Sequence, residues 1–222
     1  MIIADQKPLA EIRRITSRFQ KLLVVGCQEC VTVCCVGGAK EVAVLSSALR
    51  MAEQIDGNPK EIVEFTSVRQ CDPEYVLDLA DKIARVDAVL SMACGVGVQT
   101  IAEHFPSVHV LPALNTTSFG RNTGPGVWVE TCAGCGNCIL AETGGICPVA
   151  RCSKSLLNGP CGGSHKGLCE ISDDVPCAWA QIYERMSRLE MLATMEQIAP
   201  PKDWSTALDG GPRRRVREDM QL

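Results

Sequence analysis

Cysteine is the residue type in this sequence that could do chemistry. Fourteen of the 222 residues are cysteines, and five of them lie in the stretch TCAGCGNCILAETGGICPVARC at residues 131–152. Such thiols can form disulfides, bind zinc or hold an iron–sulfur cluster. A chain of this length can bury a core without cross-links, so its clustered cysteines indicate metal binding.

The strongest pattern joins Cys132, Cys135, Cys138 and Cys147, which have two, two and eight residues between them. Three cysteines at two-residue gaps can wrap one face of a cubane, and a fourth that precedes a proline, here Pro148, arrives from elsewhere in the chain. This is the ferredoxin-like pattern for a [4Fe–4S] cluster, whereas zinc sites more often use two separated Cys-x2-Cys pairs. We therefore predict a [4Fe–4S] cluster here, with zinc as the alternative.

Two glycines separate the first three of these cysteines. Gly134 and Gly136 are expected to take positive φ, because the chain must wind tightly between the thiols, and their N–H groups can donate to sulfur. The fourth cysteine of such a run can serve a neighbouring site. The spacing therefore leaves open which of Cys147 and Cys152 serves which site.

A second group of cysteines lies in the turn-rich stretch RCSKSLLNGPCGGSHKGLCEISDDVPCAW, with gaps of eight, seven and seven residues. Four isolated thiols on turns could bind zinc or a second [4Fe–4S] cluster, and His165 could replace one of them in a zinc site. A cluster is favoured, because four sulfurs near another cluster would make an electron relay. If the protein holds both clusters and one zinc ion, we expect the zinc at this set. The members are Cys152, Cys161, Cys169 and Cys177.

A third group follows three apolar runs that we predict to be strands, at 22–26, 62–66 and 88–93. Its members are Cys27, Cys30, Cys34 and Cys35 after the first run, Cys71 after the second and Cys94 after the third. Because the carboxyl ends of parallel strands share one edge of a sheet, these thiols should converge on another metal site. The spacing does not decide which of Cys34, Cys35, Cys71 and Cys94 completes that site, although Cys35 is expected to be a core thiol. The alternative is that these cysteines are small buried hydrophobic residues.

The elements that position these cysteines fall into two main parts. A fourth apolar run at 108–114, with helical patterns at 42–52, 73–83 and 98–105, predicts an α/β fold with a parallel sheet and helical crossovers over residues 1–120. The stretch GRNTGPGV at 120–127 is expected to be a joint. A loop-rich, cysteine-rich metal-binding module follows over residues 121–200 and ends in a helix at about 177–197.

The last part, residues 201–222, is expected to be an extended tail. Its basic residues are expected to be solvated, and the alternative is that they dock an acidic partner. They are Arg213, Arg214, Arg215 and Arg217.

Composition and missing motifs exclude several functions. The net charge of −4 gives no reason to expect nucleic acid as a partner. The sequence has no apolar run long enough for a membrane span and no recognisable signal peptide, so we expect a cytoplasmic protein. It also lacks the GxSxG, HExxH, P-loop and GxGxxG motifs, so no catalytic residue is expected on this chain.

The combination of motifs resembles one family, the small cysteine-rich subunit (MetV type) of the methylenetetrahydrofolate reductase of acetogenic bacteria, which also occurs as a C-terminal domain of some reductases. The resemblance covers about residues 20–190. It is carried by GCQECVTVCCVGG, RQCD, LSMACGVGVQT, NTTSFG, CAGCGNC, ETGGICPVARCSKSLLNGPCGG and PCAWAQIYERM.

The resemblance implies a redox subunit without an active site of its own. It implies iron–sulfur clusters, with zinc also associated with such enzymes, and a TIM-barrel partner whose FAD interconverts methylene- and methyltetrahydrofolate in the one-carbon metabolism of the Wood–Ljungdahl pathway. The cysteine groups provide for two or three [4Fe–4S] clusters, and the mixed case is clusters with one zinc ion. Ferredoxin or a heterodisulfide-reductase-like module would exchange electrons with these clusters. The alternative is a structural zinc-binding adaptor that carries no electrons.

Overall fold

The structure is a computed structural model of the 222-residue chain. The residues that it describes are 1–207, 216, 217 and 219. The chain divides into two compact units, residues 1–129 and 130–222, whereas the sequence predicted a boundary after residue 120. Among the described helices, none has the length and hydropathy that crossing a bilayer requires.

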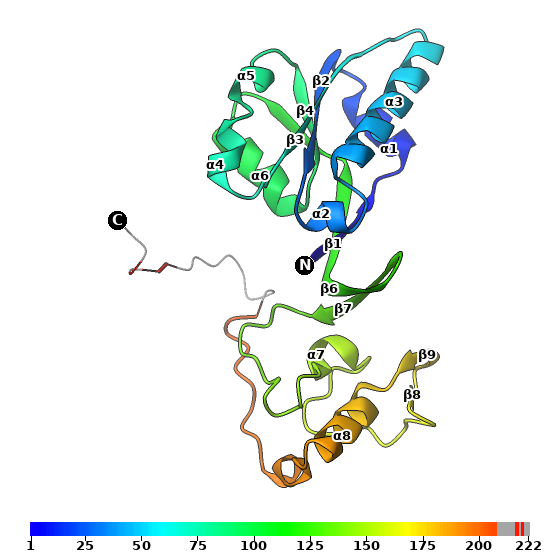
Figure 1. The fold of residues 1–222 in the computed structure, drawn as a ribbon, viewed down its shortest axis with the longest axis vertical. Coiled ribbons are helices and arrows are strands. Elements are labelled where there is room, and N and C mark those ends of the chain that lie inside the picture. The colour runs from blue at the N-terminus through cyan, green and yellow to red at the C-terminus, as the bar shows by residue number, and fades with distance from the viewer. Residues whose placement is uncertain (208–215, 218, 220–222) are drawn as a thin grey trace. The chain divides into compact units, whose positions relative to one another are not determined.

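The first unit is built on a parallel four-stranded sheet in the order β3-β2-β4-β5 (Figure 1). Its strands are β2 (Lys21–Cys27), β3 (Glu61–Ser67), β4 (Ala88–Met92) and β5 (His109–Pro112). The helices that flank it are α1 (Leu9–Thr16), α3 (Ala39–Ile55), α4 (Pro73–Leu77), α5 (Ala80–Ile83) and α6 (Gly95–His104). The predicted α/β class with a parallel sheet is therefore confirmed.

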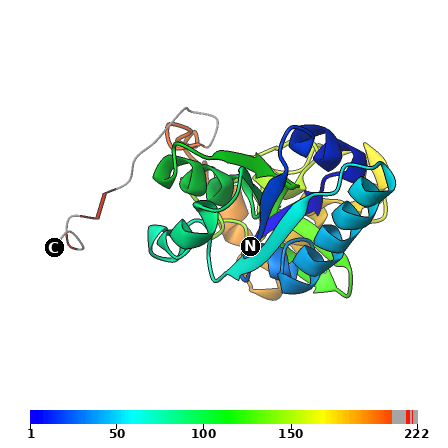
Figure 2. The same cartoon turned by 90° about the horizontal axis from the view of Figure 1, so that it is seen from above.

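The central strand β2 is buried on both faces. Leu22 and Val24 pack in one core with residues of α1 and α3, and Leu23 and Val25 pack in a second core with residues of α4, α5 and α6. Successive side chains of a strand point to opposite faces, so one apolar run supplies both cores. Figures 1 and 2 show the two helix layers on opposite sides of the sheet.

The helix predicted from Pro73 to residue 83 is instead two short helices, α4 and α5. The chain tightens between them, where the N–H of Leu79 donates to the carbonyl of Val76 at 3.1 Å, three residues back. Val76 and Leu79 are both fully buried. The tight turn keeps both apolar side chains on the sheet while it interrupts the α-helical bonding.

The joint predicted at residues 120–127 is a hairpin. β6 (Leu114–Gly124) lies between β1 (Ile2–Gln6) and β7 (Val127–Cys132) in a three-stranded sheet, and the loop Pro125–Gly126 connects β6 to β7. Gly126 has a φ of 73°, which suits a tight loop. Glycine and proline therefore close a hairpin here, and the boundary between the units lies within β7.

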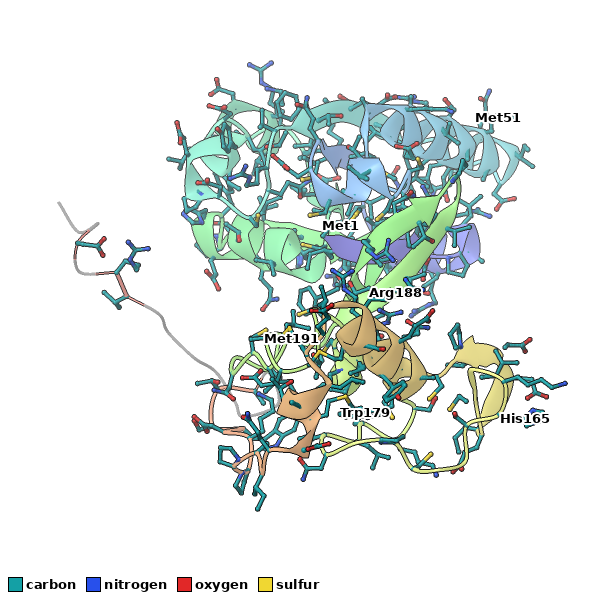
Figure 3. The ribbon with its side chains drawn as sticks, turned by 60° about the horizontal axis from the view of Figure 1, so that its bottom comes forward. Met1, Met51, His165, Trp179, Arg188 and Met191 are labelled. Carbon is teal, nitrogen blue, oxygen red and sulfur yellow. The ribbon has the colours of Figure 1, made fainter. Side chains whose placement is uncertain are left out.

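The second unit is mostly loops around one helix. Its elements are α7 (Pro148–Arg151), β8 (Leu168–Cys169), β9 (Ser172–Pro176), α8 (Ala178–Arg188) and the 3-10 helix η1 (Leu192–Glu196). Helix α8 ends at Arg188 and not near residue 197, because Glu190 takes a left-handed φ of 57° (Figure 3). The buried core consists of Trp179, Ile182 and Met186 of α8 together with Cys177.

Candidate metal centres

The cysteines of the first unit lie at the carboxyl edge of the parallel sheet, as their positions after the strands predicted. Cys27 is the last residue of β2, Cys30 begins the short helix α2 (Cys30–Val33), and Cys94 is the N-cap residue of α6. Cys71 lies four residues beyond the end of β3.

Gln70 positions Cys71, and sequence reasoning did not find it. Its side chain is fully buried and donates to the carbonyls of Val25 (2.9 Å) and Gly26 (2.8 Å), while its oxygen accepts from the hydroxyl of Ser91 at 2.6 Å. These bonds tie the loop after β3 to strands β2 and β4. A lone glutamine in RQCD carries no sequence signal for such a role.

Two of the thiols at this edge have a pKa above the ordinary value, and other thiols contribute to both shifts. The pKa of the Cys71 thiol is raised by desolvation and then by the nearby thiols of Cys94 and Cys27, although Cys71 is exposed at the surface. The pKa of the Cys34 thiol is raised by burial and then by Cys30 and Cys35.

Cys27, Cys30 and Cys34 span the end of β2 and the short helix α2, where Cys34 is the C-cap residue. Sγ of Cys34 donates to the carbonyl of Ile2 at 3.4 Å. Cys35 is exposed rather than a core thiol, and it takes a left-handed φ of 56° just after α2.

The ferredoxin-like run begins where β7 ends, at Cys132. Gly134 and Gly136 have φ values of 63° and 79°, so the predicted tight winding is confirmed. The N–H of Gly134 donates to Sγ of Cys132 at 3.4 Å, the kind of bond that supports a thiolate ligand. Cys147 is the N-cap residue of α7.

A cavity of about 560 Å³ borders this run. Cys138 lies on its wall together with residues of the 137–143 segment, Trp179 of α8 and the segment 194–202. Its size gives room for a bulky group beside this cysteine.

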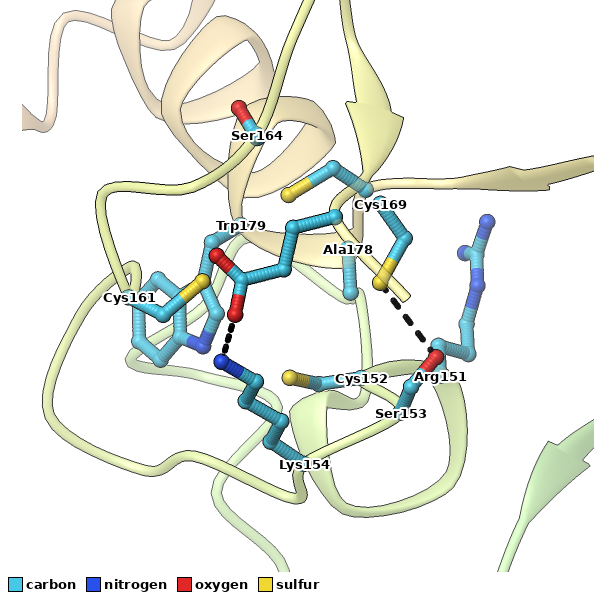
Figure 4. A pocket seen from close by; sticks show the side chains of 11 residues that line it. Arg151, Cys152, Ser153, Lys154, Cys161, Ser164, Cys169, Ala178 and Trp179 are labelled. Carbon is cyan, nitrogen blue, oxygen red and sulfur yellow. Dashed lines mark hydrogen bonds and ion pairs between the residues drawn. The ribbon is translucent and has the colours of Figure 1, made fainter. Parts of the chain in front are cut away.

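The second group of cysteines lines one much smaller cavity, of about 20 Å³ (Figure 4). Cys152 follows α7, Cys161 lies on a loop, Cys169 ends β8 and Cys177 is the N-cap residue of α8. Cysteines seven or eight residues apart are therefore gathered by four different segments. A volume of 20 Å³ is close to that of one water molecule, so the cavity has room for a single ion as the side chains stand.

Charged and polar side chains complete the wall of this small cavity. The Lys154 ammonium pairs with the Glu170 carboxylate, and both residues line the cavity together with the cysteines. The Ser153 hydroxyl lies 3.4 Å from Sγ of Cys169, and this contact, followed by backbone N–H groups, lowers the pKa of the Cys169 thiol. A lowered pKa favours the thiolate, the form that binds metals. His165 is not part of the wall; it forms a backbone bridge to Leu168, beside the β8–β9 hairpin (Figure 3).

The donor set of this cavity fits a soft metal, since four cysteines select zinc or an iron–sulfur cluster. As the side chains stand, no three His, Cys, Asp or Glu residues within residues 1–207, 216, 217 and 219 form a group that could hold a metal ion. Ligation would require the thiols to rotate toward one point. The small cavity thus identifies a donor set and not a coordination geometry.

The comparison with protein families bears on this second unit. Residues 111–205 match the family model for the methylene-tetrahydrofolate reductase C-terminal domain. The searches of curated proteins and of solved structures returned no match.

The match to the methylene-tetrahydrofolate reductase C-terminal domain spans less than half of the chain, and it includes all the cysteines from Cys132 to Cys177. It associates this part of the chain with an oxidoreductase. The cysteines of the parallel-sheet edge lie outside the matched range. Of the basic tail, Arg213, Arg214 and Arg215 lie outside the described residues, and Arg217 pairs with Asp219 at 2.6 Å.

Proposed function

We propose that this chain is the metal-carrying, electron-transferring component of a methylenetetrahydrofolate reductase complex. The observation that carries the proposal is the coincidence of the family match with two cysteine groups, one of which lines a single cavity. Iron–sulfur clusters are held by cysteine thiolates, and this chain has cysteines on turns and at helix ends.

The two groups of the second unit would hold different metals. Cys132, Cys135, Cys138 and Cys147 would hold a [4Fe–4S] cluster, for which the cavity beside Cys138 offers room. Zinc is the group that the small cavity favours, held by Cys152, Cys161, Cys169 and Cys177. Such a zinc ion is structural, and the cluster supplies one-electron transfer.

The first unit would hold a second [4Fe–4S] cluster at the carboxyl edge of its sheet. Cys27, Cys71 and Cys94 are its first candidates, because they lie at or just beyond the carboxyl ends of β2, β3 and β4. The fourth ligand would come from Cys30 or Cys34. Gln70 positions the loop that carries Cys71.

The chemistry on folate belongs to the partner in this proposal. A TIM-barrel subunit would bind FAD and interconvert methylene- and methyltetrahydrofolate, while this chain relays electrons between that flavin and ferredoxin or a heterodisulfide-reductase-like module in the cytoplasm. This chain is then a redox component of the enzyme and not its catalytic subunit.

A structural zinc adaptor is the second candidate function. The observation that favours it is the small cavity, which has room for one ion. A zinc ion at this place would carry no electrons. The adaptor would hold the second unit together for contact with the reductase.

Electron delivery to the partner flavin separates the two functions. In the anaerobically prepared complex, Cys135→Ser should abolish flavin reduction by the physiological donor, while the folate reaction with an artificial donor continues. Cys35→Ser, which replaces an exposed thiol outside the ferredoxin-like run, is the matched control. Normal flavin reduction in Cys135→Ser would contradict the relay and favour the adaptor.

A further inference from the structure

The segment after η1 returns to the ferredoxin-like run. We call residues 201–207 the strap. The Lys202 ammonium donates to the carbonyl of Asn137, in the middle of the CGNC stretch. The same ammonium lies 5.0 Å from the ring centroid of Trp204, so Lys202 contacts both Asn137 and a second residue of the strap.

The far end of the strap lies directly on Gly136. A Cβ atom built at Gly136 would lie 2.6 Å from the carbonyl oxygen of Thr206 and closer still to the Thr206 side chain. Ala207, the next residue, is only 5% exposed. The strap can therefore occupy this place only because residue 136 has no side chain, which is a second requirement for glycine besides its φ of 79°.

Among the residues that the structure describes, the Thr206 hydroxyl is buried and finds no hydrogen-bond partner. Burial of a hydroxyl without a partner destabilises the folded state, so native proteins rarely retain one without a ligand or water to satisfy it. Gly136, on which this hydroxyl lies, is one of the two residues between Cys135 and Cys138. The unsatisfied donor is therefore held against the loop that presents these thiols.

We propose that the strap is a cover for the metal site of the Cys132–Cys138 run, and that the Thr206 hydroxyl donates a hydrogen bond to sulfur at that site. This inference rests on the proposed function, because the sulfur that accepts from Thr206 belongs to the metal site of that function. A hydrogen bond to sulfur stabilises the more negative, reduced state and therefore raises the reduction potential. The exposure of the site to water also affects this potential. Thr206 is a positioning and tuning residue in this scheme, and Lys202 anchors the cover.

The first test compares Thr206→Val with Thr206→Ser in the iron-loaded protein, by redox titration monitored by EPR. Thr206→Val keeps the shape and loses the donor, so its midpoint potential should fall. The reduction equilibrium constant should change by about three- to tenfold, the worth of one hydrogen bond, which is at most about 59 mV for one electron. Thr206→Ser should keep the wild-type potential. Equal potentials in all three proteins would overturn the hydrogen bond while the electron-transfer function stands.

The second test measures the cover without any metal. In iron-free protein, Gly136→Ala should speed alkylation of Cys135 by iodoacetamide, because the new Cβ displaces Thr206. Gly145→Ala is the matched control, since Gly145 has a similar φ of 85° but open space where a Cβ would lie. Equal alkylation rates in the two variants would overturn the cover. If the chain binds no iron and Gly136→Ala alone speeds alkylation, the cover stands and the proposed cluster fails.

Discussion

Metal at the four-cysteine cavity should be the main source of stability in the second unit. The perturbation that tests this is Cys161→Ser, which removes one thiol from the cavity wall. Because Cys161 is exposed, the substitution removes no side chain from the core. Ser164→Ala changes another residue of the same wall without removing a thiol, so it is the matched control.

The expected magnitude follows from the size of the core. Trp179, Ile182 and Met186 are 6%, 0% and 0% exposed, and burial of three such side chains contributes about 5–9 kcal/mol. A structural zinc ion on thiolates contributes about 10–16 kcal/mol, which exceeds that core contribution. The first unit has two larger cores, of twelve and seven buried residues, and needs no metal of the second unit.

Hydrogen exchange of the full chain, read by mass spectrometry, measures both units at once. In Cys161→Ser, or after metal removal, the amides of α8 and of the β8–β9 hairpin should exchange at least about a hundredfold faster, a change of nearly 3 kcal/mol. Strands β2 and β4 should keep their protection. If α8 in the metal-free protein exchanged as slowly as in the metal-loaded protein, the dependence of this unit on metal would be refuted.

Three further predictions concern the first unit. Gln70→Leu should lower the free energy of unfolding by about 1–3 kcal/mol, because the carbonyls of Val25 and Gly26 and the Ser91 hydroxyl lose their partner. An unchanged midpoint of urea unfolding would exclude this role of Gln70. Gly97→Ala should lower the melting temperature at a cost of about 1–3 kcal/mol, because its Cβ would lie 2.8 Å from Cβ of Gln70; a variant as stable as wild type would show that α6 can shift freely. Asp87 accepts from the N–H groups of Gln20 (2.9 Å) and Lys21 (2.8 Å), which lower its pKa, so its contribution is present above the ordinary carboxyl pKa of about 3.9 and is lost as the pH falls through the native value. Urea midpoints between pH 2 and 7 should therefore fall less steeply with acid in Asp87→Asn than in wild type, and parallel curves would contradict the assignment.

The buried elements of the first unit were predictable because they rest on strong local patterns. Strand β2 reads as an apolar run since both its faces are covered. Strand β1 gave no such signal, because only Ala4 of its five residues is buried. The Pro125–Gly126 loop looks the same in sequence whether it separates two domains or closes a hairpin, and only the pairing of β6 with β1 and β7 decides between these.

The candidate sites were predictable to the extent that they are local. The winding of the ferredoxin-like run follows from Gly134 and Gly136 between closely spaced cysteines. The sequence predicted that the second cysteine group shares one site, but the cavity that its members line depends on loops without periodicity and could not be predicted. The contact between Thr206 and Gly136 joins residues seventy positions apart and has no sequence signal.

Metal analysis of anaerobically prepared protein, combined with EPR of its reduced form, tests the central claim most directly. The account predicts about eight iron atoms and one zinc per chain, the content of two [4Fe–4S] clusters and one zinc site, with cluster signals that appear on reduction by dithionite. Cys135→Ser should lose about half of the iron and keep the zinc, and Cys161→Ser should lose the zinc. A colourless protein that contains zinc and almost no iron would contradict the electron-transfer function.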